Sequence, residues 1–232
     1  WALSPVLLAW LWWRHRKSDA ANGHIGQRRG YIHPAPGSIH GLWIHAASVG
    51  EVQAAEPLIR ALLAQWPAAS ITVSTQSLTG AQQLRQHWGA QVQHLFLPID
   101  TPGATARFLD RLQPRLLVLI ERELWPELLL QCRQRSIPVA LVNARLSERS
   151  AQSYQRFHAL MRPVWSQLAL VACADNPSRE RLAGLGVPAH RLMDTGNLKF
   201  DLPTGTALPP SLDWLASRSA SALLPAAVGP TT

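Results

Sequence analysis

The clearest structural signal in the chain is the segment Leu42-Trp43-Ile44-His45-Ala46-Ala47-Ser48-Val49-Gly50-Glu51. Its first four residues form a short apolar run, and residues 52–65 have the spacing of an amphipathic helix. This order predicts a strand, a tight turn and a helix, with Glu51 in the first helical turn. Ligands of open α/β sheets bind at the carboxyl ends of the strands, so the segment also marks a candidate site. The helix dipole favours a carboxylate there, which suits a general base.

Strand and helix patterns alternate along most of the chain. Further apolar runs lie at 71–75, 94–97, 116–120, 139–142, 168–173 and 191–193, and helical patterns lie between them at 79–88, 103–112, 124–135, 147–165 and 178–185. Gly and Pro residues fall between these segments, where strands and helices stop. Near-continuous apolar strands that alternate with helices predict a parallel sheet covered on both faces, so the expected fold class is α/β and Rossmann-like.

The composition is that of a folded protein with anionic partners. Hydrophobic residues make up 47% and charged residues 16%, which excludes a disordered chain. Cys132 and Cys173 are too few for a disulfide framework, so we expect both to be reduced and partly buried. The net charge of +8 favours a phosphorylated substrate or an anionic membrane. Nucleic acid is not expected, because the basic residues form no long block. No metal is expected either, because no two histidines are four residues apart.

The amino-terminal residues favour contact with a membrane. Residues 1–13 are apolar apart from Ser4, and Arg14-His15-Arg16-Lys17 follows. Spanning a bilayer takes about 20 apolar residues, so this run is too short as it stands. It is rich in tryptophan beside a basic cluster, which suits the lipid–water interface. A buried core helix is the alternative. Because the chain begins with Trp1 and not Met, we expect further residues upstream.

These patterns divide the chain into four parts. We predict a membrane-anchor helix at 1–17, a basic linker at 18–41, a Rossmann-like domain at 42–202 and an irregular tail at 203–232. The tail has only two charged residues, Asp213 and Arg218, and no clear periodicity.

Four polar loops follow predicted strands. They are the Ser48–Glu51 turn and the segments Glu121-Arg122-Glu123-Leu124-Trp125-Pro126, Asn143-Ala144-Arg145-Leu146-Ser147 and Gly196-Asn197-Leu198-Lys199-Phe200-Asp201. In a parallel sheet all four loops emerge at the same edge. Two carboxylate-bearing loops, a lysine and an arginine are therefore expected to converge on one cleft.

In this order, the four motifs resemble the acceptor half of the Kdo transferases, which add 3-deoxy-D-manno-octulosonic acid (Kdo) to the lipid A precursor. Looser similarity runs over residues 5–202. The resemblance implies a GT-B glycosyltransferase with two Rossmann-like domains. Its amino-terminal domain binds the lipid acceptor, lipid IVA, and its carboxy-terminal domain binds the donor, CMP-Kdo, without a cofactor. It implies a location at the cytoplasmic face of the inner membrane of a Gram-negative bacterium.

The resemblance also implies roles for individual residues. Glu51 is the general base that deprotonates the acceptor hydroxyl, with inversion at the donor carbon. Glu121 and Lys199 occupy positions where the family stabilises the transition state. The candidate substrate contacts are Ser48, Gly50, Glu123, Asn143 and Arg145.

The chain departs from the family pattern at several places. Arg122 stands where the family usually has Thr, and Glu127 stands where it usually has Asn. Beyond Asp201 the match fades, although the family continues into a donor domain. We interpret the tail as a truncated or frameshifted reading, and we expect the 232-residue chain alone to have little or no transferase activity.

Three other interpretations remain open. Ala46-Ala47-Ser48-Val49-Gly50 approaches the nucleophile elbow of an acyl hydrolase, but Ala46 replaces its first glycine. Glu51 could serve only to begin a helix. The chain could also be a non-catalytic, membrane-bound protein that binds the lipid acceptor.

Overall fold

A computed structural model of the chain describes residues 24–35, 37–122, 124–156 and 158–198. Within these residues, the strands form a parallel sheet in the order β3-β2-β1-β4-β5-β6-β7. The strands are β1 (Leu42–His45), β2 (Ile71–Thr75), β3 (Gln93–Phe96), β4 (Leu116–Ile120), β5 (Val139–Ala144), β6 (Leu170–Cys173) and β7 (Leu192–Asp194). The predicted α/β class with a parallel sheet is confirmed.

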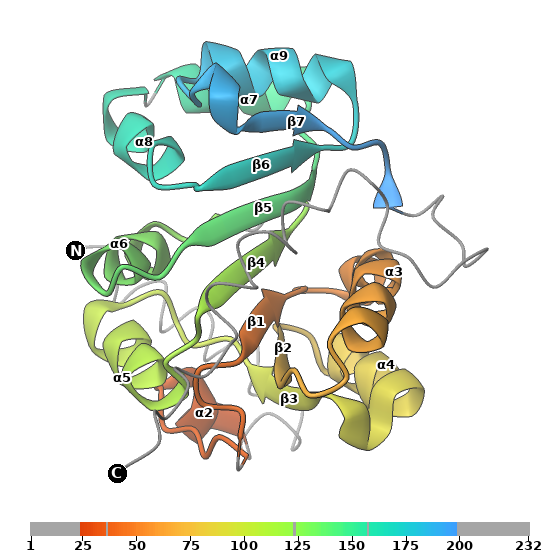
Figure 1. Cartoon of the computed structure of the whole chain (residues 1–232). Helices are drawn as coiled ribbons and strands as arrows, with labels where there is room; N and C mark the ends of the chain where they lie inside the picture. The colour runs from red at the N-terminus through yellow and green to blue at the C-terminus, as the bar shows by residue number, and fades with distance from the viewer. Residues whose placement is uncertain (1–23, 36, 123, 157, 199–232) are drawn as a thin grey trace, which may run out of the picture.

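Helices cover both faces of this sheet (Figure 1). They are α2 (Ile25–Arg28), α3 (Val49–Gln65), α4 (Leu78–Trp88), α5 (Pro102–Leu112), α6 (Pro126–Gln134), α7 (Glu148–Arg156), α8 (His158–Trp165) and α9 (Asn176–Gly184), with short 3-10 turns at Gly89–Gln91 and Ala189–Arg191. Helices α3 and α4 pack on one face, and α5 and α6 pack on the other. Successive strand residues alternate between the two cores: Leu42 and Ile44 face α3, whereas Trp43 faces α5.

The order of the strands places a switch point in the middle of the sheet. The chain runs outward from β1 through β2 to β3, then returns to place β4 on the other side of β1. His45 at the end of β1 lies opposite Leu119 in β4. The loops after these two strands diverge to opposite faces of the sheet, and ligands of open α/β sheets bind at such a switch point.

Some predicted boundaries differ from the structure for identifiable reasons. Helix α3 begins at Val49, three residues before the predicted helix, because the Ser48 side chain caps it. Strand β5 continues to Ala144 through an irregularity in its pairing with β6. Asn143 therefore lies in a strand, and the expectation that it lies in a loop is wrong. The predicted helix at 147–165 is described as α7 and α8.

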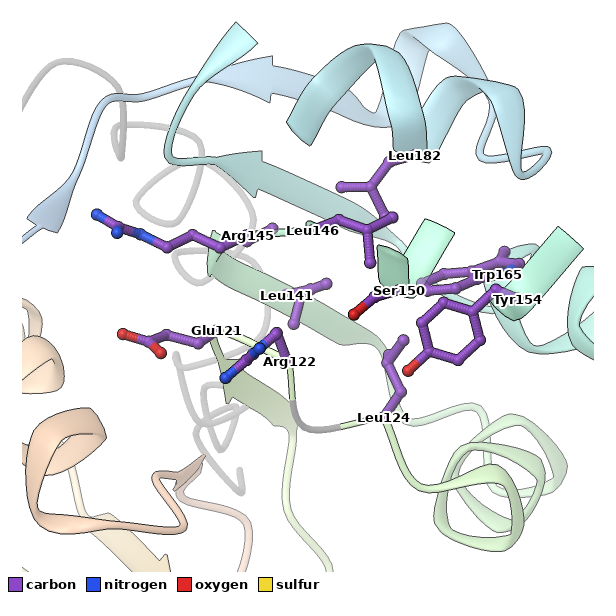
Figure 2. Close-up of a pocket in the computed structure, with 11 residues that line it drawn as sticks. Glu121, Arg122, Leu124, Leu141, Arg145, Leu146, Ser150, Tyr154, Trp165 and Leu182 are labelled. Carbon is purple, nitrogen blue, oxygen red and sulfur yellow. The ribbon is translucent and has the colours of Figure 1, made fainter. Parts of the chain in front are cut away.

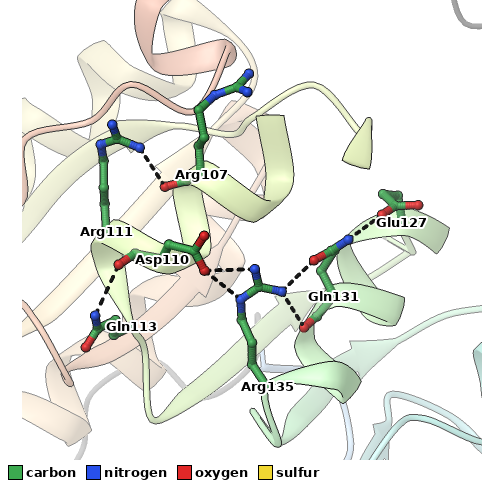
Figure 3. Close-up of polar contacts among 7 residues, drawn as sticks. All are labelled: Arg107, Asp110, Arg111, Gln113, Glu127, Gln131 and Arg135. Carbon is green, nitrogen blue, oxygen red and sulfur yellow. Dashed lines mark hydrogen bonds and ion pairs between the residues drawn. The ribbon is translucent and has the colours of Figure 1, made fainter. Parts of the chain in front are cut away.

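A polar cluster joins α5 to α6 (Figure 3). Asp110 accepts hydrogen bonds from Arg135 Nε at 2.9 Å and from Arg135 Nη2 at 2.8 Å. Arg135 Nη1 donates to Gln131 Oε1 at 2.5 Å, and Gln131 Nε2 donates to Glu127 Oε1 at 2.8 Å. Because Asp110 is exposed, its ion pair with Arg135 contributes little to the free energy of unfolding. The cluster therefore orients the two helices more than it stabilises them.

Residues 24–33 cover the outer edge of β3. Gln27 Oε1 accepts the backbone N–H of Phe96 at 2.9 Å, and Gln93 Nε2 donates to the carbonyl of His33 at 3.2 Å. Ile32 is buried against α5 and β3. Part of the segment predicted as a basic linker is therefore folded against the sheet. The predicted anchor helix at 1–17 and the tail at 203–232 lie outside the described residues. Among the helices that are described, none has the length and hydropathy to cross a bilayer.

Candidate active site

Glu51 lies in the first turn of α3, at the carboxyl end of β1, as the sequence predicts. Its Oε2 accepts the backbone N–H of Ala47 at 2.6 Å, and its Oε1 accepts the hydroxyl of Ser48 at 3.3 Å. Ser48 Oγ in turn accepts the Glu51 N–H at 3.4 Å. Ser48 thus caps the helix, and the Glu51 side chain reaches back to Ala47, the residue before the cap, which holds the carboxylate at the positive end of the helix.

Glu121 directly follows β4, the strand beside β1. Its φ is +64°, a left-handed backbone conformation that few non-glycine residues adopt. Its backbone N–H donates to the carbonyl of Val142 at 2.9 Å, which extends the pairing of β4 with β5. The half-buried side chain leaves the sheet at the edge where Glu51 lies, so the two carboxylates flank the switch point of the sheet.

Asn143 connects the Glu121 loop to the segment after β7. It is fully buried and also has a left-handed φ, +56°. Its Nδ2 donates to Glu121 Oε1 at 3.5 Å, and its Oδ1 accepts the backbone N–H of Leu198 at 3.3 Å. Sequence reasoning placed Asn143 among the substrate contacts. In the structure its amide is directed at protein atoms, which suits a residue that positions others.

Arg145 leaves the end of β5 on the same side as Glu121 (Figure 2). Both residues border a small hollow whose other walls include Leu141 and the buried Trp165. Arg122 lies on the same rim. The lining of this hollow therefore combines one acidic and two basic residues with apolar side chains, and the charged ends of Glu121 and Arg145 extend away from the apolar part (Figure 2).

Two of the remaining predicted residues are exposed, and two lie outside the described residues. Ser48 is exposed, and its hydroxyl is bonded to Glu51, the residue that it caps. Gly50 is also exposed, with open space where a side chain would stand. Glu123 and Lys199 lie outside the described residues, although Lys199 directly follows Leu198, which Asn143 holds in place. The capping role of Ser48 accounts for its position without an acyl-hydrolase function.

Sequence reasoning missed Asp100, which anchors the helix that follows the Glu121 loop. Its two carboxylate oxygens accept the backbone N–H groups of Glu127 at 3.1 Å and Leu128 at 2.8 Å, in the first turn of α6. Burial raises the pKa of this carboxyl, against the two backbone hydrogen bonds, which lower it. The contact crosses from the β3–α5 loop to α6, so no local pattern could reveal it.

The two cysteines are structural. Both thiols are free and buried, and burial raises the pKa of each to about 12. Thiolates are the reactive form of cysteine, so neither is suited to nucleophilic chemistry. In the described ranges, no group of three or more His, Cys, Asp or Glu side chains is arranged to hold a metal ion.

Comparisons with known proteins show the family of the chain. A family model described as "3-Deoxy-D-manno-octulosonic-acid transferase (kdotransferase)" matches residues 23–202. The chain belongs to this family. The chain is 40% identical over 215 residues to the 3-deoxy-D-manno-octulosonic acid transferase of Haemophilus influenzae, covering 91% of the chain and 50% of that relative. It is 37% identical over 210 residues to the Bordetella pertussis transferase, covering 86% of the chain and 48% of the relative. The chain thus spans about half the length of these family members.

Solved structures support the fold alone. The UDP-GlcNAc 2-epimerase of Neisseria meningitidis bound to UDP-GlcNAc matches with a TM-score of 0.53 at 13% identity, covering 78% of the chain and 50% of the epimerase. A putative UDP-N-acetylglucosamine 2-epimerase of Listeria monocytogenes matches with a TM-score of 0.52 at 15% identity, covering 76% of the chain and 51% of that protein. Each match covers half of the larger protein, as expected for one half of a GT-B-like fold.

Proposed function

We propose that this chain is the acceptor-binding half of a transferase that moves Kdo from CMP-Kdo to lipid IVA in lipopolysaccharide core biosynthesis. The observation that carries this proposal is the carboxylate of Glu51, held by Ala47 at the carboxyl end of β1, where the order of the strands reverses. Family membership supports the reaction class. CMP-Kdo would bind to a second domain, of the kind that occupies the other half of the GT-B fold.

In this proposal Glu51 acts as the general base. A sugar hydroxyl is a poor nucleophile near neutral pH, so its proton must leave as its oxygen attacks. The proton passes to the Glu51 carboxylate while the acceptor oxygen bonds to the anomeric carbon of Kdo. The bond from that carbon to the CMP phosphate breaks, and CMP leaves with the electron pair. Attack from the face opposite CMP inverts the anomeric centre.

Glu121 and Lys199 would stabilise the charges that develop in this step. The anomeric carbon becomes positive in the transition state, and a fixed carboxylate such as Glu121 favours that charge. Lys199 would offset phosphate charge on CMP or on the acceptor. Support for their joint action comes from Asn143, because one amide contacts both Glu121 and the residue that precedes Lys199.

The acceptor chemistry also suggests where the protein works. A glycolipid acceptor lies in a membrane, and the predicted Trp-rich residues 1–17 and the positive net charge suit an anionic surface. We therefore propose the cytoplasmic face of the inner membrane as its location.

Replacing Glu51 by Gln tests the proposed base. Gln retains an amide oxygen that can accept the Ala47 N–H, so the helix cap survives while the proton acceptor is lost. The test uses the complete gene product with CMP-Kdo and lipid IVA. We expect kcat to fall by about 10²–10⁴-fold. Glu56→Gln is the matched control, because Glu56 lies on the same helix and pairs with Arg60 at the surface. Near-normal transfer by Glu51→Gln would remove Glu51 from the base role.

A further inference from the structure

A cluster of basic side chains surrounds Phe96, the last residue of β3. His24 stacks on this ring with centroids 4.0 Å apart, and the His94 ring meets its edge at 4.8 Å. The guanidinium carbon of Arg28 lies 5.2 Å from the Phe96 centroid. Arg85, in α4, donates to His94 Nδ1 at 3.2 Å. Residues in or next to α2, α4 and β3 thus bring four basic groups together.

Among the residues that the structure describes, no carboxylate forms an ion pair with this cluster. Burial lowers the pKa of Arg28, and burial followed by the charges of Arg85 and Arg28 lowers the pKa of His24. Burial, Arg85 and His24 together lower the pKa of His94 to about 4. Two guanidinium charges, both close enough to lower the pKa of His24 and one of them half-buried, favour a bound anion.

The cluster is accessible to solvent on one side and is linked by hydrogen bonds to the candidate active site on the other. Arg85 is exposed and His24 is half-buried, so an anion can approach from outside. On the inner side, Arg28 Nη2 donates to the carbonyl of Gln76 at 2.5 Å. The Gln76 N–H donates to the carbonyl of Ala47 at 3.0 Å, and the Ala47 N–H donates to Glu51. Two adjacent loops therefore separate the cluster from the proposed base.

We propose that His24, Arg28 and Arg85 bind a phosphate monoester group, and that this group belongs to the glycolipid acceptor. A monoester carries nearly two negative charges at neutral pH and offers three acceptor oxygens, which match two guanidinium groups and a histidine. A phospholipid diester carries one charge and is the alternative source of a phosphate. The site itself does not depend on the proposed function; only the identity of the molecule that bears the phosphate does.

Binding of phosphate to the 232-residue chain tests the site without any transfer reaction. The probes are inorganic phosphate and glucosamine 1-phosphate, followed by calorimetry and by the NMR signals of His24 and Phe96. We expect Arg85→Gln to weaken both affinities by about tenfold or more, since it removes a charge-assisted contact. Arg133→Gln, which removes an exposed charge from α6, is the control and is expected to leave both affinities unchanged. Equal affinities in the two variants, or no saturable binding, would overturn the site.

Two further arms identify the source of the phosphate. Vesicles of phosphatidylglycerol in phosphatidylcholine test the diester. If Arg85→Gln weakens binding to these vesicles but not to inorganic phosphate or glucosamine 1-phosphate, the monoester assignment is overturned. In the complete gene product, we expect Arg85→Gln to raise the KM for lipid IVA with little change in kcat. The difference in KM should vanish when the acceptor lacks its phosphates. If it persists, the site does not bind the acceptor phosphate. These results are separate from the Glu51→Gln result, so the two proposals can fail independently.

Discussion

Asn143 donates a hydrogen bond to Glu121 across the ends of two neighbouring strands, and both residues have left-handed backbone conformations. A left-handed φ costs a non-glycine L-residue roughly 1–2 kcal/mol, and Asn tolerates it better than most. The same amide accepts the Leu198 N–H. Asn143, at the end of β5, therefore orients the Glu121 carboxylate. It also holds the backbone of Leu198, the residue before Lys199.

Asn143→Gly separates the backbone role of this residue from its amide role. Glycine accepts the left-handed φ but loses both side-chain contacts. We expect kcat for Kdo transfer to fall about tenfold or more, because a small misplacement of catalytic groups is costly. The KM for the acceptor should change little. Asn143→Ala should lose a further 1 kcal/mol or so of stability in urea unfolding, since Ala is strained at this φ. Unchanged kcat in Asn143→Gly would contradict the positioning role.

Ser48→Ala should lower the free energy of unfolding by about 1 kcal/mol, because it removes the cap of α3. Ser77→Ala is the matched control: Ser77 caps α4 by accepting the Gly80 N–H at 3.0 Å. We expect similar losses of stability in urea unfolding for the two variants. Only Ser48→Ala should reduce transfer, because only Ser48 also donates to Glu51. Equal activities in the two variants would indicate that the Ser48 hydroxyl does nothing beyond capping.

His94 should make the folded state sensitive to acid. Its Nδ1 faces Arg85, and its Nε2 contacts Thr75 Oγ1 at 2.9 Å, so the added proton would meet a guanidinium group. Burial, Arg85 and His24 lower the pKa of His94 to about 4. Between pH 4 and 6.5 the unfolded chain binds this proton and the folded chain does not, so stability falls as the pH falls. The loss could reach about 3 kcal/mol across that window.

Urea unfolding at pH 4.5 and 7 measures this effect. His94→Gln should reduce the pH dependence, whereas His87→Gln, at an exposed position on α4, should not. A dependence that is identical in the wild type and in His94→Gln would show that other groups cause it.

Asp100→Ala should be among the more destabilising substitutions near the site. It leaves the Glu127 and Leu128 N–H groups without their carboxylate partner, at a cost of about 1–3 kcal/mol. Asp110→Ala also removes a carboxylate, but its pair with Arg135 is largely solvated and should contribute less than about 1 kcal/mol. Thermal unfolding of the two variants gives the comparison. A larger loss for Asp110 would mean that the cluster in Figure 3 stabilises the α5–α6 interface more than its exposure suggests.

The sequence predicted those features that depend on local signals. The strand, turn and helix around Glu51 follow from an apolar run and helical spacing, and the structure has all three elements. The Ser48 cap, which starts the helix three residues earlier, was not predicted. Features that depend on contacts between distant residues were missed. The buried position of Asn143 arises from an irregular end of β5, and the role of Asp100 depends on a helix that begins 26 residues later. Neither contact leaves a pattern in neighbouring residues.

Residues 24–33, which cover the outer edge of β3, also bear on self-association of the protein. Strand β3 ends the sheet on its side among the described residues, and the outward N–H of Phe96 bonds to Gln27 in the segment 24–33. A chain that lost this cover would offer an unpaired strand to other copies of itself, and such edges promote intermolecular pairing. The short segment that precedes the sheet thus protects the protein from self-association, and a shortened version that began after Ala35 would be prone to aggregate even with every proposed catalytic residue in place.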